Sequence, residues 1–219
     1  MRQFRREPLA LIDGLLSDAL KERYGPISAR VLRHDASERE AHLVDSEGVT
    51  RTYSLTFLSR PMPAPLRPVN EKIRGGRLMG ETFRDLGFAI RKNVFDIFIV
   101  ESPAWLRKAF RTKERYAWAR IFEFNVRKGA SPPLLYATLC EIFTPDFKPP
   151  LVTPTDVSWL NPCTRALLAC GVSREQAWRE INRLEEGTDV NGRFVEGRIA
   201  TLPYAFDLRD RVTRRLASR

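Results

Sequence analysis

A glutamate at position 141 lies in a segment that is otherwise apolar. Residues 134–143 have the alternation of a β-strand, and one face carries Leu135, Ala137, Leu139, Glu141 and Phe143. The other face carries Leu134, Tyr136, Thr138, Cys140 and Ile142. Because both faces are largely apolar, we expect the strand to be central and covered on each side.

Burial makes Glu141 a candidate for chemistry. An isolated buried carboxylate is costly, and its pKa rises unless a cation or a hydrogen-bond donor meets it. Such groups act as acids, bases or ligand contacts in functional sites. The alternative is that Glu141 lies near the strand end and reaches solvent or pairs with an arginine.

Arg39 shares the face of an expected strand with Ala41 and Leu43, whereas Glu38, Glu40 and His42 alternate on the other face. The forked donors of an arginine suit the two oxygens of a carboxylate, so Arg39 is a candidate anion contact. Periodicity alone favours the simpler alternative, an edge-strand arginine whose head group reaches solvent.

Arg120 has a similar setting, with aromatic residues at alternate positions: Trp118, Phe122 and Phe124. Three roles fit this pattern. Arg120 could be a second anion contact, a cation–π partner of the neighbouring rings, or the ion-pair partner of Glu123 or Glu141.

Common cofactor and nucleophile motifs are missing from the sequence. The glycines at 75, 76 and 80 form neither a GxGxxG nor a Walker pattern, and there is no GxSxG elbow. The three cysteines have no CxxC spacing, and only His34 and His42 could join them in a metal site. We therefore expect no metal, no cofactor and no disulfide framework.

The elements that position these residues follow from hydrophobic periodicity and from turn residues. Helical spacing predicts a helix over 9–24. Strands are expected over 27–32, 39–44, 52–58, 94–100, 117–126 and 134–143. The turn residues at 45–48 and at 128–133 predict two hairpins.

Proline governs the connections. Four prolines in residues 59–70 predict an irregular surface segment, followed by a helix or turn over 71–85. Ser102-Pro103 marks a helix start, with Trp105, Leu106, Ala109 and Phe110 facing inward.

We expect an α+β protein, an antiparallel β-sheet with helices packed on it, in one domain over residues 1–150. Residues 151–219 would form a C-terminal helical appendage, with a short capped helix near 173–187 and a basic tail from Arg209.

The chain is basic, with 37 Lys and Arg against 27 Asp and Glu and a formal net charge of +10. This charge attracts nucleic acids, acidic metabolites and anionic membranes alike. The arginines are scattered without an aromatic-basic motif, so nucleic acid is the less favoured partner. We expect a cytoplasmic protein with no membrane-spanning segment, since the sequence has no signal-peptide pattern and no run of about 18 apolar residues.

The order of these elements resembles the chorismate lyase family and its wider UTRA superfamily, which includes the effector-binding domains of GntR-type repressors. The resemblance covers roughly residues 9–147 and consists of four short segments in the family's order. These are Asp13-Gly14-Leu15-Leu16, Arg39-Glu40-Ala41-His42-Leu43, Leu78-Met79-Gly80, and Pro133-Leu134-Leu135-Tyr136 with Glu141. Residues 81–116 lack the family's Ser/Thr-rich stretch, the run from 136 to 141 is longer than usual, and 151–219 have no counterpart.

The resemblance implies roles for individual residues. Arg39 would bind the substrate carboxylate, Glu141 would face the ring hydroxyl, and Leu15, Met79 and Gly80 would contact the ligand through their backbone. The implied activity is elimination of pyruvate from chorismate, or from a related cyclic enol ether, to give a hydroxybenzoate without a cofactor. The alternative is a non-catalytic, effector-type domain that binds a small anionic cyclic or aromatic acid.

Overall fold

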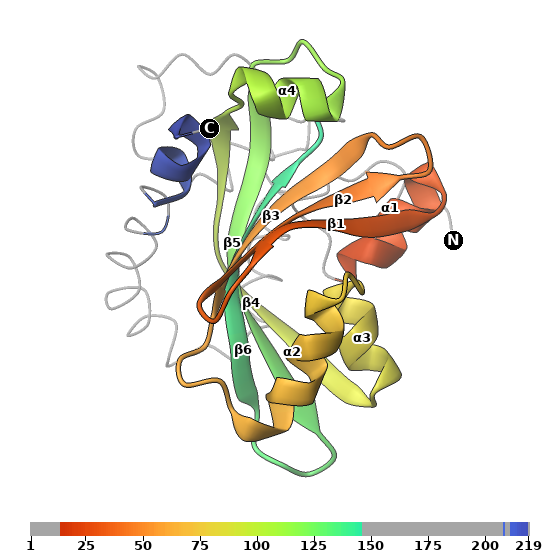
Figure 1. Ribbon diagram of the computed structural model, residues 1–219, viewed down its shortest axis with the longest axis vertical. Coiled ribbons are helices and arrows are strands. Elements are labelled where there is room, and N and C mark those ends of the chain that lie inside the picture. Colours follow the sequence, from red (N-terminus) through yellow and green to blue (C-terminus); the bar gives the residue numbers. More distant parts are fainter. Residues whose placement is uncertain (1–13, 146–207, 209–210, 219) are drawn as a thin grey trace, which may run out of the picture.

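The computed structural model describes residues 14–145, 208 and 211–218. Its centre is a six-stranded antiparallel sheet with the strand order β1-β2-β3-β6-β5-β4 (Figure 1). The strands are β1 Ile27–His34, β2 Glu38–Asp45, β3 Thr50–Leu58, β4 Phe88–Glu101, β5 Tyr116–Lys128 and β6 Leu134–Phe143. The expected α+β class with an antiparallel sheet is thus confirmed, and β6 has the predicted bounds.

The β2–β3 hairpin forms where the turn residues predicted it. Asp45 Oδ1 accepts hydrogen bonds from the backbone N–H groups of Glu47 (3.0 Å) and Val49 (2.9 Å). Gly48 has a φ of 73°, a left-handed conformation that glycine adopts without strain. The register that places Arg39 opposite Thr56 is set by this turn together with a one-residue shift of the ladder between Leu43 and Val44.

Helices cover both faces of the sheet. The helices are α1 Leu16–Tyr24, α2 Arg67–Arg74, α3 Met79–Asp85 and α4 Ala104–Phe110, with a 3-10 turn over Ala64–Leu66. Residues 211–217 form a further, C-terminal helix. We call the side covered by α1, α2 and α3 the α1–α3 face; it carries Arg39, Ser54, Phe122, Phe124 and Glu141.

The opposite side, the α4 face, carries Tyr53, Leu55, Ala119, Cys140 and Ile142. Leu106 and Phe110 of α4 pack there, as predicted from their spacing. Leu208, Val212 and Leu216 pack on the same face, so the end of the basic tail is part of the core. The helix expected near 173–187 lies outside the described residues.

Three expectations about element bounds were wrong. The first helix begins at Leu16, because Leu15 is extended (φ −68°, ψ 123°); residues 9–13 lie outside the described part of the chain. The segment 59–70 is not wholly irregular. The 3-10 turn lies in it and α2 starts in it, with Pro68 in the first turn, where a missing N–H breaks no helical hydrogen bond. The strand expected from 94 begins at Phe88.

Tyr136 also lies on the face opposite to the one predicted. The ladder between β5 and β6 is regular up to the pair Phe124–Ala137 and then shifts to Asn125–Leu135. The extra residue is Tyr136, a β-bulge that breaks the alternation of the strand. Its ring packs against Phe83 of α3, with 4.9 Å between ring centroids.

None of the helices in the described part of the chain is long and apolar enough to cross a membrane.

Candidate functional site

A pocket lies between the α1–α3 face of the sheet and the first residues of α1 and α3. The sheet supplies its floor, which we define as Arg39, Leu43, Ser54, Phe122, Phe124, Leu139 and Glu141. The helix starts supply its roof, Leu15, Leu16, Ser17, Leu78, Met79 and Gly80, and Lys92 of β4 closes one side. Arg39, Glu141, Leu15, Met79 and Gly80, all predicted site residues, therefore meet in one place.

The size of the pocket limits its ligand. The cavity volume is about 50 Å³. On this measure a single water molecule needs roughly 10–15 Å³. The pocket suits a molecule of a few water volumes, such as one small ring, and is too small for a nucleotide.

The roof depends on a close approach between α1 and α3. Leu15 and Leu78 precede these helices in an extended conformation, so both helix starts lie over the floor. A Cβ atom on Gly80 would lie 2.8 Å from Leu15 Cδ2. Glycine at position 80 thus lets the Leu15 side chain lie against α3.

Arg39 is a buried cation, with only 2% of its surface exposed. Its Nε and Nη2 atoms have no hydrogen-bond partner among the described residues. Burial lowers the pKa of its guanidinium, and the nearby Tyr136 hydroxyl partly opposes this effect. An arginine remains protonated even so. Buried donors without partners are rare, and an anion in the pocket would satisfy these.

The described groups around Arg39 add no negative charge that would replace such an anion. Tyr136 Oη donates to Asn70 Oδ1 at 2.7 Å, and His34 Nε2 lies 3.2 Å from the same oxygen. Burial raises the pKa of Tyr136, so its hydroxyl is neutral. Burial, and then the charges of Arg39 and Arg74, lower the pKa of His34, which keeps the imidazole neutral near pH 7.

Glu141, in contrast, has a partner. Arg120 Nε donates to Glu141 Oε2 at 2.9 Å, and Arg120 Nη2 lies 2.8 Å from the same oxygen. The Arg120 guanidinium also lies over the rings of Phe122 (5.0 Å) and Phe143 (5.3 Å). Two of the three roles considered for Arg120 are therefore observed together. Arg120 is not among the residues that line the pocket, and it reaches the site through Glu141.

The sheet register sets the separation of Arg39 and Glu141. Arg39 lies opposite Thr56, which lies opposite Leu139, two residues before Glu141 on β6. Strands are about 4.8 Å apart and residues advance about 3.4 Å along them, so two strands and two residues place the two Cα atoms about 12 Å apart. Both side chains line the same pocket, so they can approach a small ligand from two ends.

Ser17, Ser54 and Lys92 line the pocket as well, and sequence reasoning missed all three. Ser17 is 7% exposed, and its Oγ has no hydrogen-bond partner within the described ranges. The prediction of a helix from Leu9 placed Ser17 in a helix interior, whereas it belongs to the first turn of α1. A correct helix start would have drawn attention to it.

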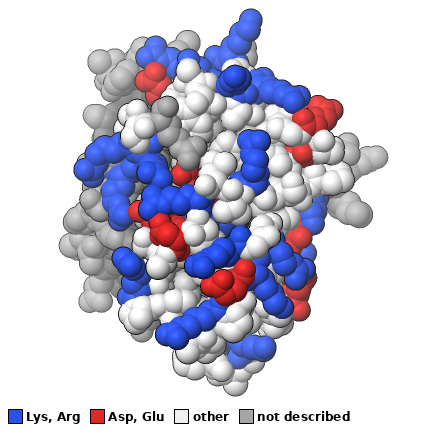
Figure 2. Space-filling view, viewed as in Figure 1, with Lys and Arg blue, Asp and Glu red and all other residues white. Residues whose placement is uncertain are grey.

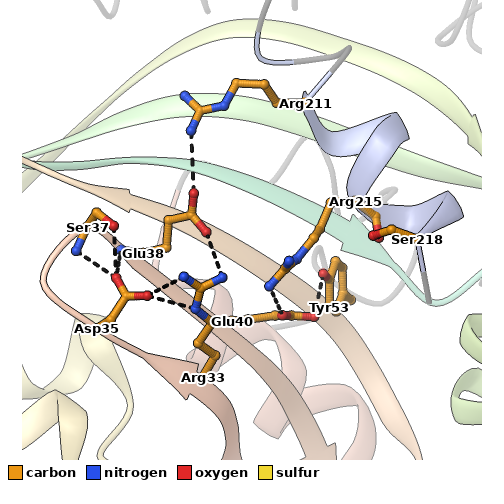
Figure 3. Close-up of polar contacts among 9 residues, drawn as sticks. All are labelled: Arg33, Asp35, Ser37, Glu38, Glu40, Tyr53, Arg211, Arg215 and Ser218. Carbon is orange, nitrogen blue, oxygen red and sulfur yellow. Dashed lines mark hydrogen bonds and ion pairs between the residues drawn. The ribbon is translucent and has the colours of Figure 1, made fainter.

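The α4 face carries a second polar cluster, and its charges are paired (Figure 3). Tyr53 Oη donates to Glu40 Oε1 at 2.7 Å, and Arg215 Nη2 donates to Glu40 Oε2 at 3.3 Å. Arg211 Nη2 donates to Glu38 Oε1 at 3.4 Å. A wider pocket, lined in part by Glu38 and Arg211, lies beside this second ion pair. These ion pairs tie the C-terminal helix to β2, and only Arg215 Nε of the two tail arginines is buried without a partner among the described residues. Because the charges of this cluster are paired, the α1–α3 pocket is the better site.

The described part of the face shown in Figure 2 has no single basic track for a long polyanion. On the face shown in Figure 2, Lys and Arg side chains are spread over several elements, with acidic groups between them. Within the described residues, no three His, Cys, Asp or Glu side chains are close enough to share a metal ion.

Comparison with family models and with curated protein sequences found no match for this chain. The contents of the pocket are therefore the basis for assigning a function.

Proposed function

We propose that the pocket binds a small ring acid through Arg39, and that the protein is a chorismate lyase-like enzyme. It would eliminate pyruvate from chorismate, or from a related cyclic enol ether, and release a hydroxybenzoate. The observation that carries this proposal is the buried Arg39 guanidinium, whose Nε and Nη2 lack partners in the described structure.

The hydrogen-bonding groups on the floor select a hydroxy acid. A guanidinium has only donors, so Arg39 requires an acceptor such as a carboxylate. A carboxylate held by Arg120 has only acceptors, so Glu141 requires a donor such as a hydroxyl group. Between these ends the floor is apolar, with Phe122, Phe124 and Leu139, which suits the faces of a ring.

The reaction needs little more than this arrangement. The ring C–O bond to the enol ether breaks and an adjacent ring carbon loses its proton, so the electron pair of that C–H bond completes the aromatic ring. The departing enolate of pyruvate takes up a proton. Arg39 would fix the ring carboxylate, Glu141 would orient the hydroxyl or carry the proton, and the roof would limit the access of water.

A second candidate function is binding without catalysis, as in an effector-type domain of the same fold. The observation that favours it is the double contact between Arg120 and Glu141 Oε2. A carboxylate held on one oxygen by two guanidinium nitrogens is a well-oriented hydrogen-bond acceptor, and accepting a hydrogen bond from a ligand hydroxyl needs no proton transfer.

The deciding experiment is incubation of the purified protein with chorismate, followed by mass spectrometry for pyruvate and hydroxybenzoate. Glu141→Gln is the test variant, and Glu123→Gln is the control, since Glu123 lies on β5 and contacts Asn93 and Asn125 outside the pocket. Both products, lost only in Glu141→Gln, would support the lyase. A thermal shift with hydroxybenzoates but no turnover would support the binding domain, and neither response would refute both functions.

A further inference from the structure

We propose that Ser17 and Lys92 form a second recognition point in the pocket, which binds an oxygen acceptor that Arg39 does not hold. The ligand would then be a ring acid with a second acceptor group, such as a second carboxylate. This inference rests on the proposed function, because it takes Arg39 as the site of the first carboxylate.

Ser17 is the residue that carries the inference. Its side chain lines the pocket, and its buried Oγ has no hydrogen-bond partner in the described part of the chain. Serines at helix starts commonly cap the helix, but α1 is preceded by Leu15 and has no side-chain cap. The hydroxyl therefore has no structural task that explains its burial, and a ligand oxygen would supply the missing partner.

Lys92, which closes one side of the pocket, adds a positive charge beside the roof. Its Nζ donates to the carbonyl oxygen of Gly14 at 2.7 Å, which places the ammonium group beside the first turn of α1. Asp18, the residue after Ser17, is exposed and pairs with Arg84 at 2.7 Å. Glu141, on the floor, is the only acid among the described residues that line the pocket. A cation and a hydroxyl together favour an acceptor over a donor.

The order of the strands in the sheet places the recognition points one after another across the floor. Arg39 is on β2, Glu141 on β6 and Lys92 on β4, and the sheet order is β1-β2-β3-β6-β5-β4. Glu141 is thus between the two cations. A ligand that crosses the floor would place a carboxylate at Arg39, a hydroxyl at Glu141 and a second acceptor near Ser17 and Lys92.

The test compares two probes by isothermal titration calorimetry. One is 4-hydroxybenzoate, and the other is 3-(carboxymethoxy)-4-hydroxybenzoate, which adds an ether-linked carboxylate. We expect the unmodified protein to bind the diacid more tightly. Ser17→Ala and Lys92→Met should each weaken diacid binding about tenfold or more, as expected for a lost hydrogen bond to a charged group, and leave the affinity for the monoacid nearly unchanged.

Ser102→Ala is the matched control. Ser102 is buried and its Oγ also lacks a partner among the described residues, but it lies two residues before α4 and does not line the pocket. This variant should bind both probes like the unmodified protein, and Ser17→Thr, which keeps the hydroxyl, should retain the preference for the diacid.

The outcomes separate the two proposals. If the protein binds 4-hydroxybenzoate but does not prefer the diacid, or if Ser17→Ala weakens both probes equally, the second recognition point is wrong and the first stands. If the protein binds neither probe, the proposed function fails.

Discussion

Replacing Arg39 with methionine should make the free protein more stable and unable to bind its ligand. Methionine keeps most of the length of the side chain and removes the charge. In the folded protein the Arg39 guanidinium is 2% exposed, and its Nε and Nη2 have no partner among the described residues. Arg39→Met removes both unmet donors, so the ligand-free state loses a source of instability while the ligand loses its anchor.

The magnitude follows from those two atoms. An unmet buried donor costs about 1–3 kcal/mol, so two cost about 2–6 kcal/mol. Water that enters the pocket can relieve part of this cost, and we expect the free energy of unfolding to rise by about 2 kcal/mol. For a chain of this size that corresponds to a rise in Tm of about 4–8 °C. Loss of a buried charge-assisted contact should weaken ligand binding by about 2–5 kcal/mol, or roughly 30-fold to several thousand-fold.

The measurements are thermal unfolding without ligand and calorimetry with 4-hydroxybenzoate. Arg120→Met is the control, because it removes the other buried arginine and leaves Glu141 without its partner. Breaking a buried ion pair costs about 3–5 kcal/mol, so this variant should be less stable than the unmodified protein. The reasoning is refuted if Arg39→Met and Arg120→Met shift Tm in the same direction, or if Arg39→Met binds the acid normally.

Two further variants test the roof and the first hairpin. Gly80→Ala places a Cβ atom 2.8 Å from Leu15 Cδ2, so the Leu15 side chain should move into the pocket. Calorimetry should then show weaker acid binding. The Tm should stay nearly unchanged, because the end of a flexible side chain can move at little energetic cost. Burial alone would raise the pKa of Asp45, but hydrogen bonds from Val49 N–H and Arg51 outweigh it and hold the pKa below its ordinary value of 3.8. The ionised Asp45 therefore stabilises the fold above about pH 4 and loses this effect as the pH falls through the lowered pKa. The stability of Asp45→Asn, measured by urea unfolding, should thus depend less on pH below about pH 4.

The sequence predicted the floor of the pocket better than its roof. Strand alternation is a strong signal when both faces of a sheet are buried, and it placed Arg39 on a face with Ala41 and Leu43. The roof depends on where two short helices begin. Helix bounds respond to tertiary contacts such as the approach of Leu15 to Gly80, which no local pattern reveals.

Partners distant in sequence were beyond prediction for a similar reason. Glu40, the neighbour of Arg39, points to the α4 face, where Arg215 meets it from 175 residues later. Alternation shows that neighbouring residues face opposite sides of a sheet, but not which later segment covers each side. Two neighbouring charged residues therefore differ in their partners. Glu40 is paired, whereas Nε and Nη2 of Arg39 have no partner among the described residues.

The bulge at Tyr136 explains why Glu141 pairs with Arg120. Near the turn, Val126 lies opposite Leu134, and an unbroken ladder from there would place Arg120 opposite Cys140. Residues directly opposite share a face, so Glu141 would then project from the other side of the sheet with respect to Arg120. One extra residue on β6 shifts the register, brings Arg120 opposite Glu141, and turns both toward the α1–α3 face. Deleting one residue at this bulge should therefore separate the ion pair and destroy the site, even where each strand keeps its apolar pattern.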